Sequence, residues 1–167
     1  MTITDSSNNL SPRKRAGLIF FVFGLITAGS LIPGRLVIAT SNSIEHRVFF
    51  KQIKFSRDEV KKGSYVLMEL YTDVQPDCMP CLISKKVSCT EGDTLTISGN
   101  EYFCNDQLIG KSKKFSQKGK PTNPYIQTGK LGKGEIFVTG NHKDSYDSKY
   151  FGPRKIEDVK ALLLPII

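Results

Sequence analysis

The chain has 167 residues, of which 39% are hydrophobic and 24% charged, and its net charge is +8. This composition suits one folded domain with a short appendage and excludes a chain that is disordered throughout. The basic excess is typical of proteins that bind nucleic acid or an anionic membrane surface. We favour the membrane and expect no nucleic-acid partner, because the basic residues are spread along the chain without a recognisable nucleic-acid-binding motif.

The N-terminal part of the chain predicts a membrane anchor. Residues 1–15 are polar and end in a basic cluster, which is typical of a cytoplasmic tail. Residues 16–34 carry no charge and as a helix would reach about 28 Å, close to the thickness of a bilayer core. The positive-inside rule then places residues 35–167 across the membrane. A cleaved signal peptide and a buried soluble helix are the alternatives to this retained anchor.

Residues 35–167 are predicted to form a mainly antiparallel β domain. Gly99-Asn100 lies between two alternating segments and is typical of a hairpin turn. Residues 111–134 are rich in Lys, Gly and Pro, which predicts a mobile surface loop. Short apolar or alternating segments predict strands at 36–39, 49–53, 65–71, 94–98, 101–105, 135–139 and 159–167.

A lysine pair lies on one more predicted strand, within residues 82–89. Lys85 has Ile83 and Val87 two residues to either side, so all three side chains point to the same face. Desolvation among apolar neighbours lowers the pKa of a lysine, and a neutral amine is a general base. Lysine is the base in Ser–Lys hydrolase sites. The competing interpretation is that Lys85 and Lys86 are solvated charges on an edge strand.

Four motifs in chain order resemble those of a known family. A serine followed by an apolar residue, Ser43-Ile44, comes after the apolar N-terminal run. A strand, Gly63–Met68, precedes the lysine motif Lys85–Asp93, which ends in Gly-Asp. The last motif spans residues 140–152 and ends in Asp-Ser-Lys-Tyr-Phe-Gly. Together they resemble the type I signal peptidases, and most closely the conjugative-transfer branch of TraF type.

The chain departs from the family pattern at three places. Glu45 stands where the family commonly has a proline, beside the candidate nucleophile. Lys86 and Lys149 replace arginines, and lysine lacks the bidentate fork of arginine. The last motif is one residue short at its left-hand end, which leaves the roles of Asn141 and His142 open.

The resemblance implies a membrane-anchored serine endopeptidase that needs no cofactor and no metal. It makes Ser43 the nucleophile and Lys85 its general base, with an acyl-enzyme as intermediate. The oxyanion would be held by the Ser43 backbone N–H and the Ser41 hydroxyl, and Ser145 would orient the lysine. Asp147 and Lys149 would brace the last motif as an ion pair.

The four cysteines admit a zinc site or two disulfides. Cys78 and Cys81 have the spacing of half a zinc knuckle, but Cys89 and Cys104 lie too far apart to form the other half. Outside the cytoplasm, four cysteines more often form disulfides. Cys89 and Cys104 flank the Gly99-Asn100 turn at similar distances, which predicts that they pair and leaves Cys78 with Cys81.

By resemblance, the substrate is a membrane-tethered precursor, such as a pilin precursor of conjugative transfer. The protein would be a single-pass protein of the bacterial inner membrane, with its catalytic domain in the periplasm beside anionic lipid. Hydrolysis and closure of a pilin into a ring share the acyl-enzyme and differ in whether water or an amine attacks it. The alternative is a non-catalytic anchored β scaffold of a pilus or secretion assembly, which the substitution at Glu45 keeps open.

Overall fold

The first of two compact units in the structure is Met1–Leu36, and the second is Val37–Ile167. In the first unit, residues 16–17, 19–21 and 24 are helical. Among the described residues, no helix is long and apolar enough to cross a membrane. Much of the predicted anchor at 16–34 lies outside the residues that the structure describes, so the anchor stays a prediction. The computed structural model describes residues 16–17, 19–21, 24, 33–39, 43–72, 74 and 78–166.

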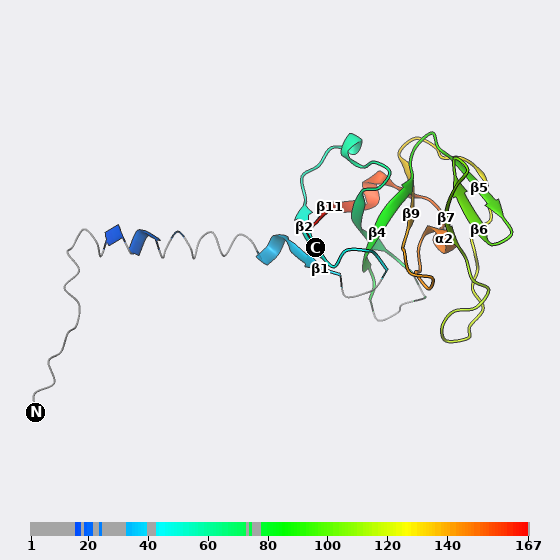
Figure 1. Ribbon diagram of the computed structural model, residues 1–167, viewed down its shortest axis with the longest axis horizontal. Coiled ribbons are helices and arrows are strands. Elements are labelled where there is room, and N and C mark those ends of the chain that lie inside the picture. Colours follow the sequence, from blue (N-terminus) through cyan, green and yellow to red (C-terminus); the bar gives the residue numbers. More distant parts are fainter. Residues whose placement is uncertain are drawn as a thin grey trace, which may run out of the picture. The chain divides into compact units, whose positions relative to one another are not determined.

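The second unit is built from two antiparallel sheets, shown in Figure 1. The larger has seven strands in the order β1-β2-β11-β3-β4-β9-β10, and the smaller has four in the order β7-β6-β5-β8. The strands of the larger sheet are β1 (Leu36–Ile38), β2 (Val48–Gln52), β3 (Tyr65–Leu70), β4 (Cys81–Cys89), β9 (Glu135–Thr139), β10 (Arg154–Lys155) and β11 (Val159–Pro165). Those of the smaller sheet are β5 (Thr94–Ser98), β6 (Glu101–Cys104), β7 (Gln107–Lys111) and β8 (Gly129–Lys130).

The other helical elements of the described residues are short turns beside the strands. They are η1 (Pro33–Arg35), η2 (Arg57–Glu59), α2 (Ser148–Phe151) and η3 (Ile156–Asp158). The prediction of a mainly antiparallel β domain is therefore confirmed. The predicted loop at 111–134 contains β8 and an isolated bridge between Phe115 and Pro121.

The strand with the lysine pair lies inside the larger sheet rather than at its edge. β4 pairs with β3 on one side and with β9 on the other. Its burial alternates, and Cys81, Lys85, Val87 and Cys89 are buried. The interpretation of Lys85 as a solvated edge charge is therefore wrong.

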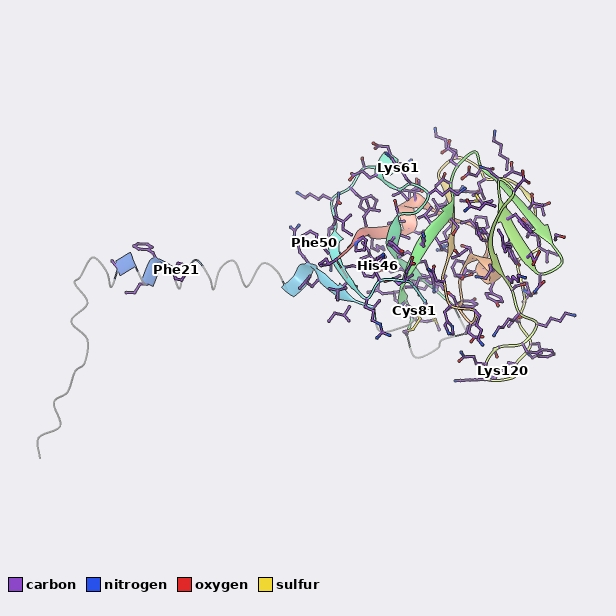
Figure 2. All side chains as sticks on the ribbon, in the orientation of Figure 1. Phe21, His46, Phe50, Lys61, Cys81 and Lys120 are labelled. Carbon is purple, nitrogen blue, oxygen red and sulfur yellow. A yellow bond between two sulfur atoms is a disulfide. The ribbon has the colours of Figure 1, made fainter. Side chains whose placement is uncertain are left out.

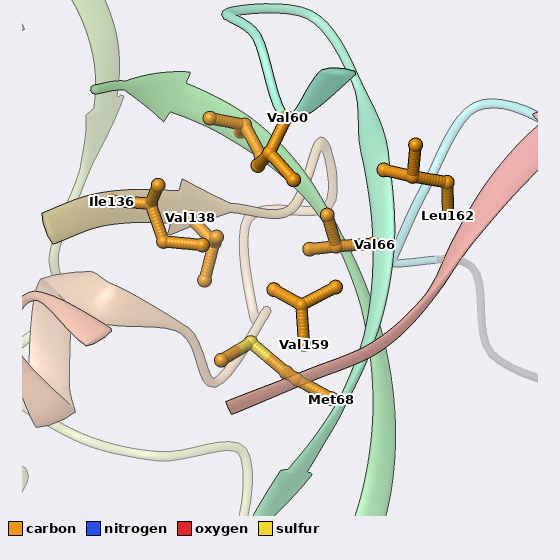
Figure 3. Close-up of a cluster of buried hydrophobic side chains, with 8 residues drawn as sticks. Val60, Val66, Met68, Ile136, Val138, Val159 and Leu162 are labelled. Atoms are coloured by element: carbon orange, nitrogen blue, oxygen red, sulfur yellow. The ribbon is translucent and has the colours of Figure 1, made fainter. Parts of the chain in front are cut away.

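One face of the larger sheet covers a cluster of eight buried apolar residues, most of which are labelled in Figure 3. Val66 and Met68 come from β3, and Val87 comes from β4. Apolar burial of this kind stabilises a fold by about 25 cal/mol per Å² removed from water. The cluster also supplies the apolar surroundings of Lys85, because Val66 lies directly opposite Lys85 across the β3–β4 pair. Its members are Val60, Val66, Met68, Val87, Ile136, Val138, Val159 and Leu162.

Both predicted disulfides are present. Cys89 and Cys104 are joined, as are Cys78 and Cys81, and Figure 2 labels Cys81. The sulfurs of Cys89 and Cys104 are bonded to each other, so they are not available as zinc thiolates. The bond ties the end of β4 to β6 of the smaller sheet. Closing a loop of about 15 residues contributes roughly 3 kcal/mol in the chain-entropy model.

Candidate active site

Lys85 is buried on the apolar face of β4, with only 4% of its surface exposed. Ile83 and Val87 flank it on the same face, as the strand alternation predicts. Burial lowers its pKa from 10.5 to about 8; the Asp147 carboxylate opposes this shift and the Lys149 ammonium adds to it. Lys85 therefore carries a neutral fraction near neutral pH, which a solvated lysine lacks.

Ser145 holds the amino group of Lys85 in place. The Lys85 Nζ donates a hydrogen bond of 2.9 Å to the Ser145 Oγ, and both side chains are buried. Ser145 lies between β9 and α2, where its own N–H donates to the His142 carbonyl at 2.9 Å. A neutral amine has two N–H donors and one lone pair. Donation to Ser145 restricts its rotation and so the direction of the lone pair.

Asp147 and Lys149 form the expected ion pair, with 2.6 Å between the Lys149 Nζ and the Asp147 Oδ2. Both side chains are buried. The same carboxylate accepts from the Gly140 N–H at 2.9 Å and from the Lys149 N–H at 3.1 Å. The Ser148 Oγ accepts from the Val138 N–H at 3.0 Å. These contacts close residues 140–147 onto the end of β9 and set the position of Ser145.

Ser43 reaches this loop through its backbone. The Asn141 N–H donates to the Ser43 carbonyl oxygen at 2.7 Å. Gly140 precedes Asn141 and lies close to both Ser43 and Ser145. A β-carbon added to Gly140 would be 2.6 Å from the Ser43 carbonyl oxygen and would overlap the Ser145 Oγ. The backbone of Ser43 therefore lies beside the loop that carries Ser145, the hydrogen-bond partner of Lys85. Ser41, the other predicted oxyanion donor, lies outside the described residues.

Gly140 and Asn141 both take part in the site, whereas the sequence left the roles of Asn141 and His142 open and assigned none to Gly140. Both belong to the last motif, at the end where it is one residue short. Their roles are carried by backbone atoms, an N–H for Asn141 and the absence of a side chain for Gly140. The glycine was a usable signal, because a glycine in a motif often marks close backbone approach. The partner of the Asn141 N–H could not be found from the sequence alone.

Lys86 and Glu45 both lie near the side chain of Tyr65. Lys86 is opposite Tyr65 in the β3–β4 register, and its Nζ lies 5.8 Å from the centre of the Tyr65 ring. The Tyr65 hydroxyl lies 3.5 Å from the Glu45 Oε2, at the limit of a hydrogen bond. Adjacent strand residues point to opposite faces, so Lys86 is directed away from the face of Lys85.

The site contains a buried lysine, a serine that orients it and a second serine whose backbone contacts the same loop. Comparison of the sequence with known families adds to this geometry. The sequence model of the family described as "Signal peptidase, peptidase S26" matches residues 15–164. The chain belongs to the signal peptidase family. No curated protein matches the chain. Family membership supports a serine peptidase function for the chain.

Membership of the signal peptidase family explains why the four motifs of the sequence occur in this order. The match extends over nearly all of the described chain, from residue 15 to residue 164, and so includes each of the four motifs. It supports the family-level prediction. The assignment to the conjugative-transfer branch stays a prediction, as does the role of each site residue.

Proposed function

We propose that the chain is a membrane-anchored serine endopeptidase that removes signal peptides with a Ser43–Lys85 dyad. The observation that carries the proposal is the state of Lys85, which is buried, has a pKa lowered to about 8 and donates a hydrogen bond to Ser145. A structural lysine gains nothing from such a site, because burial of the charged form is costly. A general base gains a neutral fraction at working pH.

The reaction starts with attack of the Ser43 Oγ on the carbonyl carbon of the scissile peptide bond. Neutral Lys85 takes the hydroxyl proton as the new C–O bond forms. The tetrahedral intermediate then loses its amine, which receives this proton from Lys85, and the acyl-enzyme remains. Water attacks the ester with Lys85 again as base, and Ser43 is released. The Ser43 N–H and the Ser41 hydroxyl are the proposed oxyanion donors.

The proposed substrate is a membrane-tethered precursor of the exported type, such as a pilin precursor of conjugative transfer. The proposed location is the bacterial inner membrane, with residues 1–15 in the cytoplasm and residues 35–167 in the periplasm. The two disulfides support an oxidising compartment. The exposed apolar side chains of Ile19, Phe20 and Phe21 support the anchor. An amine in place of water would close a pilin into a ring.

The test is processing of a reporter precursor whose signal peptide ends in Ala-x-Ala, co-expressed with the full chain and scored by size. We expect cleavage by the wild type and only the precursor with Ser43→Ala. Ser98→Ala is the matched control, because Ser98 is exposed on β5, and it should process normally. An uncut precursor with the wild type would overturn the proposal and favour the scaffold alternative. Full processing by Ser43→Ala would overturn the Ser43–Lys85 dyad.

The pH dependence should follow the titration of Lys85. Its folded-state pKa of about 8 lies below the unfolded value of 10.5. The neutral base therefore disappears as pH falls through 8, and kcat/KM should drop about tenfold for each further unit. The free energy of unfolding should also decrease as pH falls from 10.5 to about 8, because in this range the unfolded chain binds a proton at Lys85 and the folded protein does not. It should change little at lower pH. Initial rates between pH 5.5 and 9.5, with circular dichroism to check folding, measure this. A flat profile below pH 8 would contradict it.

A further inference from the structure

A basic pocket adjoins the candidate active site. Its volume is about 360 Å³, and it lies among the end of β7, residues 139–143 and Lys149. Four basic residues line it, and no acidic residue does: these are Lys111, His142, Lys143 and Lys149. A pocket of this size holds a side chain rather than a large ligand. Its charge selects an anionic group.

Lys149 is the buried cation of this pocket, with 3% of its surface exposed. Its ammonium has three N–H donors, and the one described partner of the Nζ is the Asp147 Oδ2. That carboxylate is already occupied, since it also accepts from the Gly140 and Lys149 N–H groups. Within the described part of the chain, two donors of Lys149 therefore lack a protein acceptor. A buried donor without an acceptor is costly, and an anion in the pocket would supply one.

The rim of the pocket adds further donors. Lys143 is exposed and makes no ion pair with any described residue. The His142 Nδ1 is engaged by Asp144, since it accepts from the Asp144 N–H at 3.2 Å and lies 3.8 Å from the Asp144 Oδ2. Lys111 is already paired with Glu101 at 2.6 Å. Lys143 is therefore the most available of the rim charges.

The position of the pocket connects it to peptide substrates. Gly140 and Asn141 both line it, and the Asn141 N–H binds the Ser43 carbonyl oxygen at 2.7 Å. An extended peptide advances about 3.3 Å per residue, so a group in the pocket belongs to a residue only a few positions from the bond presented to Ser43. A lipid phosphate has no comparable reason to lie beside the nucleophile.

We propose that this pocket binds a carboxylate of the peptide substrate, carried within a few residues of the scissile bond. The proposal rests on the proposed peptidase function and names a substrate class for it, peptides with an acidic residue or a free C-terminal carboxylate near the cut. Charge-assisted hydrogen bonds to a buried lysine are stronger than neutral ones. A glutamine at the same position fills the same space without the charge, and it is therefore the matched probe.

The experiment compares peptides that carry Ala-x-Ala before the cut and a single Glu or Gln at each of four positions on either side. The peptides are made as C-terminal amides, and a second set ends in a free carboxylate. We expect kcat/KM of the wild type to favour Glu over Gln about tenfold at one position, or the free acid over the amide. The two sets distinguish an acidic side chain from a chain terminus.

Two variants test whether the pocket causes this preference. Lys143→Glu should abolish or reverse the Glu/Gln ratio, whereas the control Lys133→Glu, with the same charge change at an exposed site outside the pocket, should keep it. No Glu/Gln or acid/amide discrimination at any position, or discrimination unchanged by Lys143→Glu, would overturn the proposal. A preference that appears only with vesicles of anionic phospholipid would also overturn it, in favour of a lipid site.

A binding measurement separates this proposal from the proposed function. Calorimetry with the Ser43→Ala variant needs no catalysis, and it should show about tenfold tighter binding of the Glu peptide than of the Gln peptide. Equal binding of the two peptides to this variant, beside normal cleavage by the wild type, would reject the pocket alone. Absence of cleavage of every peptide, beside selective binding, would reject the peptidase function alone.

Discussion

Lys85→Met should abolish activity and at the same time stabilise the fold. The loss of the base should lower kcat/KM at least about 10³-fold, within the range of general base catalysis. The pKa shift from 10.5 to about 8 means that burial of this amine costs roughly 3 kcal/mol below pH 8. Methionine has a similar length and no charge to desolvate, so Tm should rise at pH 7. Peptide cleavage and thermal unfolding of the same preparation measure both effects.

Lys86→Met is the matched control for this substitution. The two lysines are adjacent on β4, and Lys86 is directed towards the Tyr65 ring rather than Ser145. Lys86 is half-buried, so its removal should change kcat/KM by no more than about threefold and leave Tm within a few degrees. An active Lys85→Met enzyme would refute the dyad. An inactive Lys86→Met enzyme beside it would show that the neighbouring lysine is the base.

The strands could be predicted from the sequence because their signals are local. Tyr65–Leu70 has an alternating or apolar pattern, and Gly99-Asn100 is a hairpin turn between β5 and β6. A local signal for β7 was missed. Asn105 and Asp106 both have positive φ, which is the geometry of a two-residue hairpin turn and links β6 to β7.

The order of the strands could not be predicted in the same way. β11, the last strand of the chain, lies between β2 and β3 in the larger sheet rather than at an edge. Its residues pair with segments about a hundred positions earlier, for example Leu162 with Gln52 and Val66. Such pairings depend on how several apolar faces pack together, and no periodicity within β11 specifies its neighbours.

In the candidate site too, the features with a local sequence signal could be predicted and those made by distant residues could not. The face of Lys85 follows from strand alternation, and the Asp147–Lys149 pair follows from the family motif. The contact of Asn141 with Ser43 joins distant parts of the chain through a backbone hydrogen bond. The basic pocket likewise forms only because separate segments of the chain lie side by side in the fold. Backbone contacts of this kind leave no residue type in the sequence to mark the partner.

Gly140→Ala should be nearly as damaging as loss of a catalytic group. The new β-carbon would overlap the Ser145 Oγ and lie 2.7 Å from the Ser145 Cβ and 2.6 Å from the Ser43 carbonyl oxygen. The carbonyl belongs to the backbone, so no side-chain rotation relieves that contact. The loop must move away from Ser43, which displaces the hydroxyl that holds Lys85. We expect kcat/KM to fall at least about 100-fold and stability by about 1–3 kcal/mol.

Two comparisons show whether this loss acts through Lys85. At Gly34, an added methyl meets nothing within 4 Å among the described residues, so Gly34→Ala should retain activity. Ser145→Ala removes the hydrogen bond to Lys85 without adding bulk. If Gly140→Ala acts by displacing Ser145, the double variant should lose less activity than the two single losses predict together, because both remove the same contact. Full activity of Gly140→Ala would mean that Ser43 and Ser145 need not be held at this separation for catalysis.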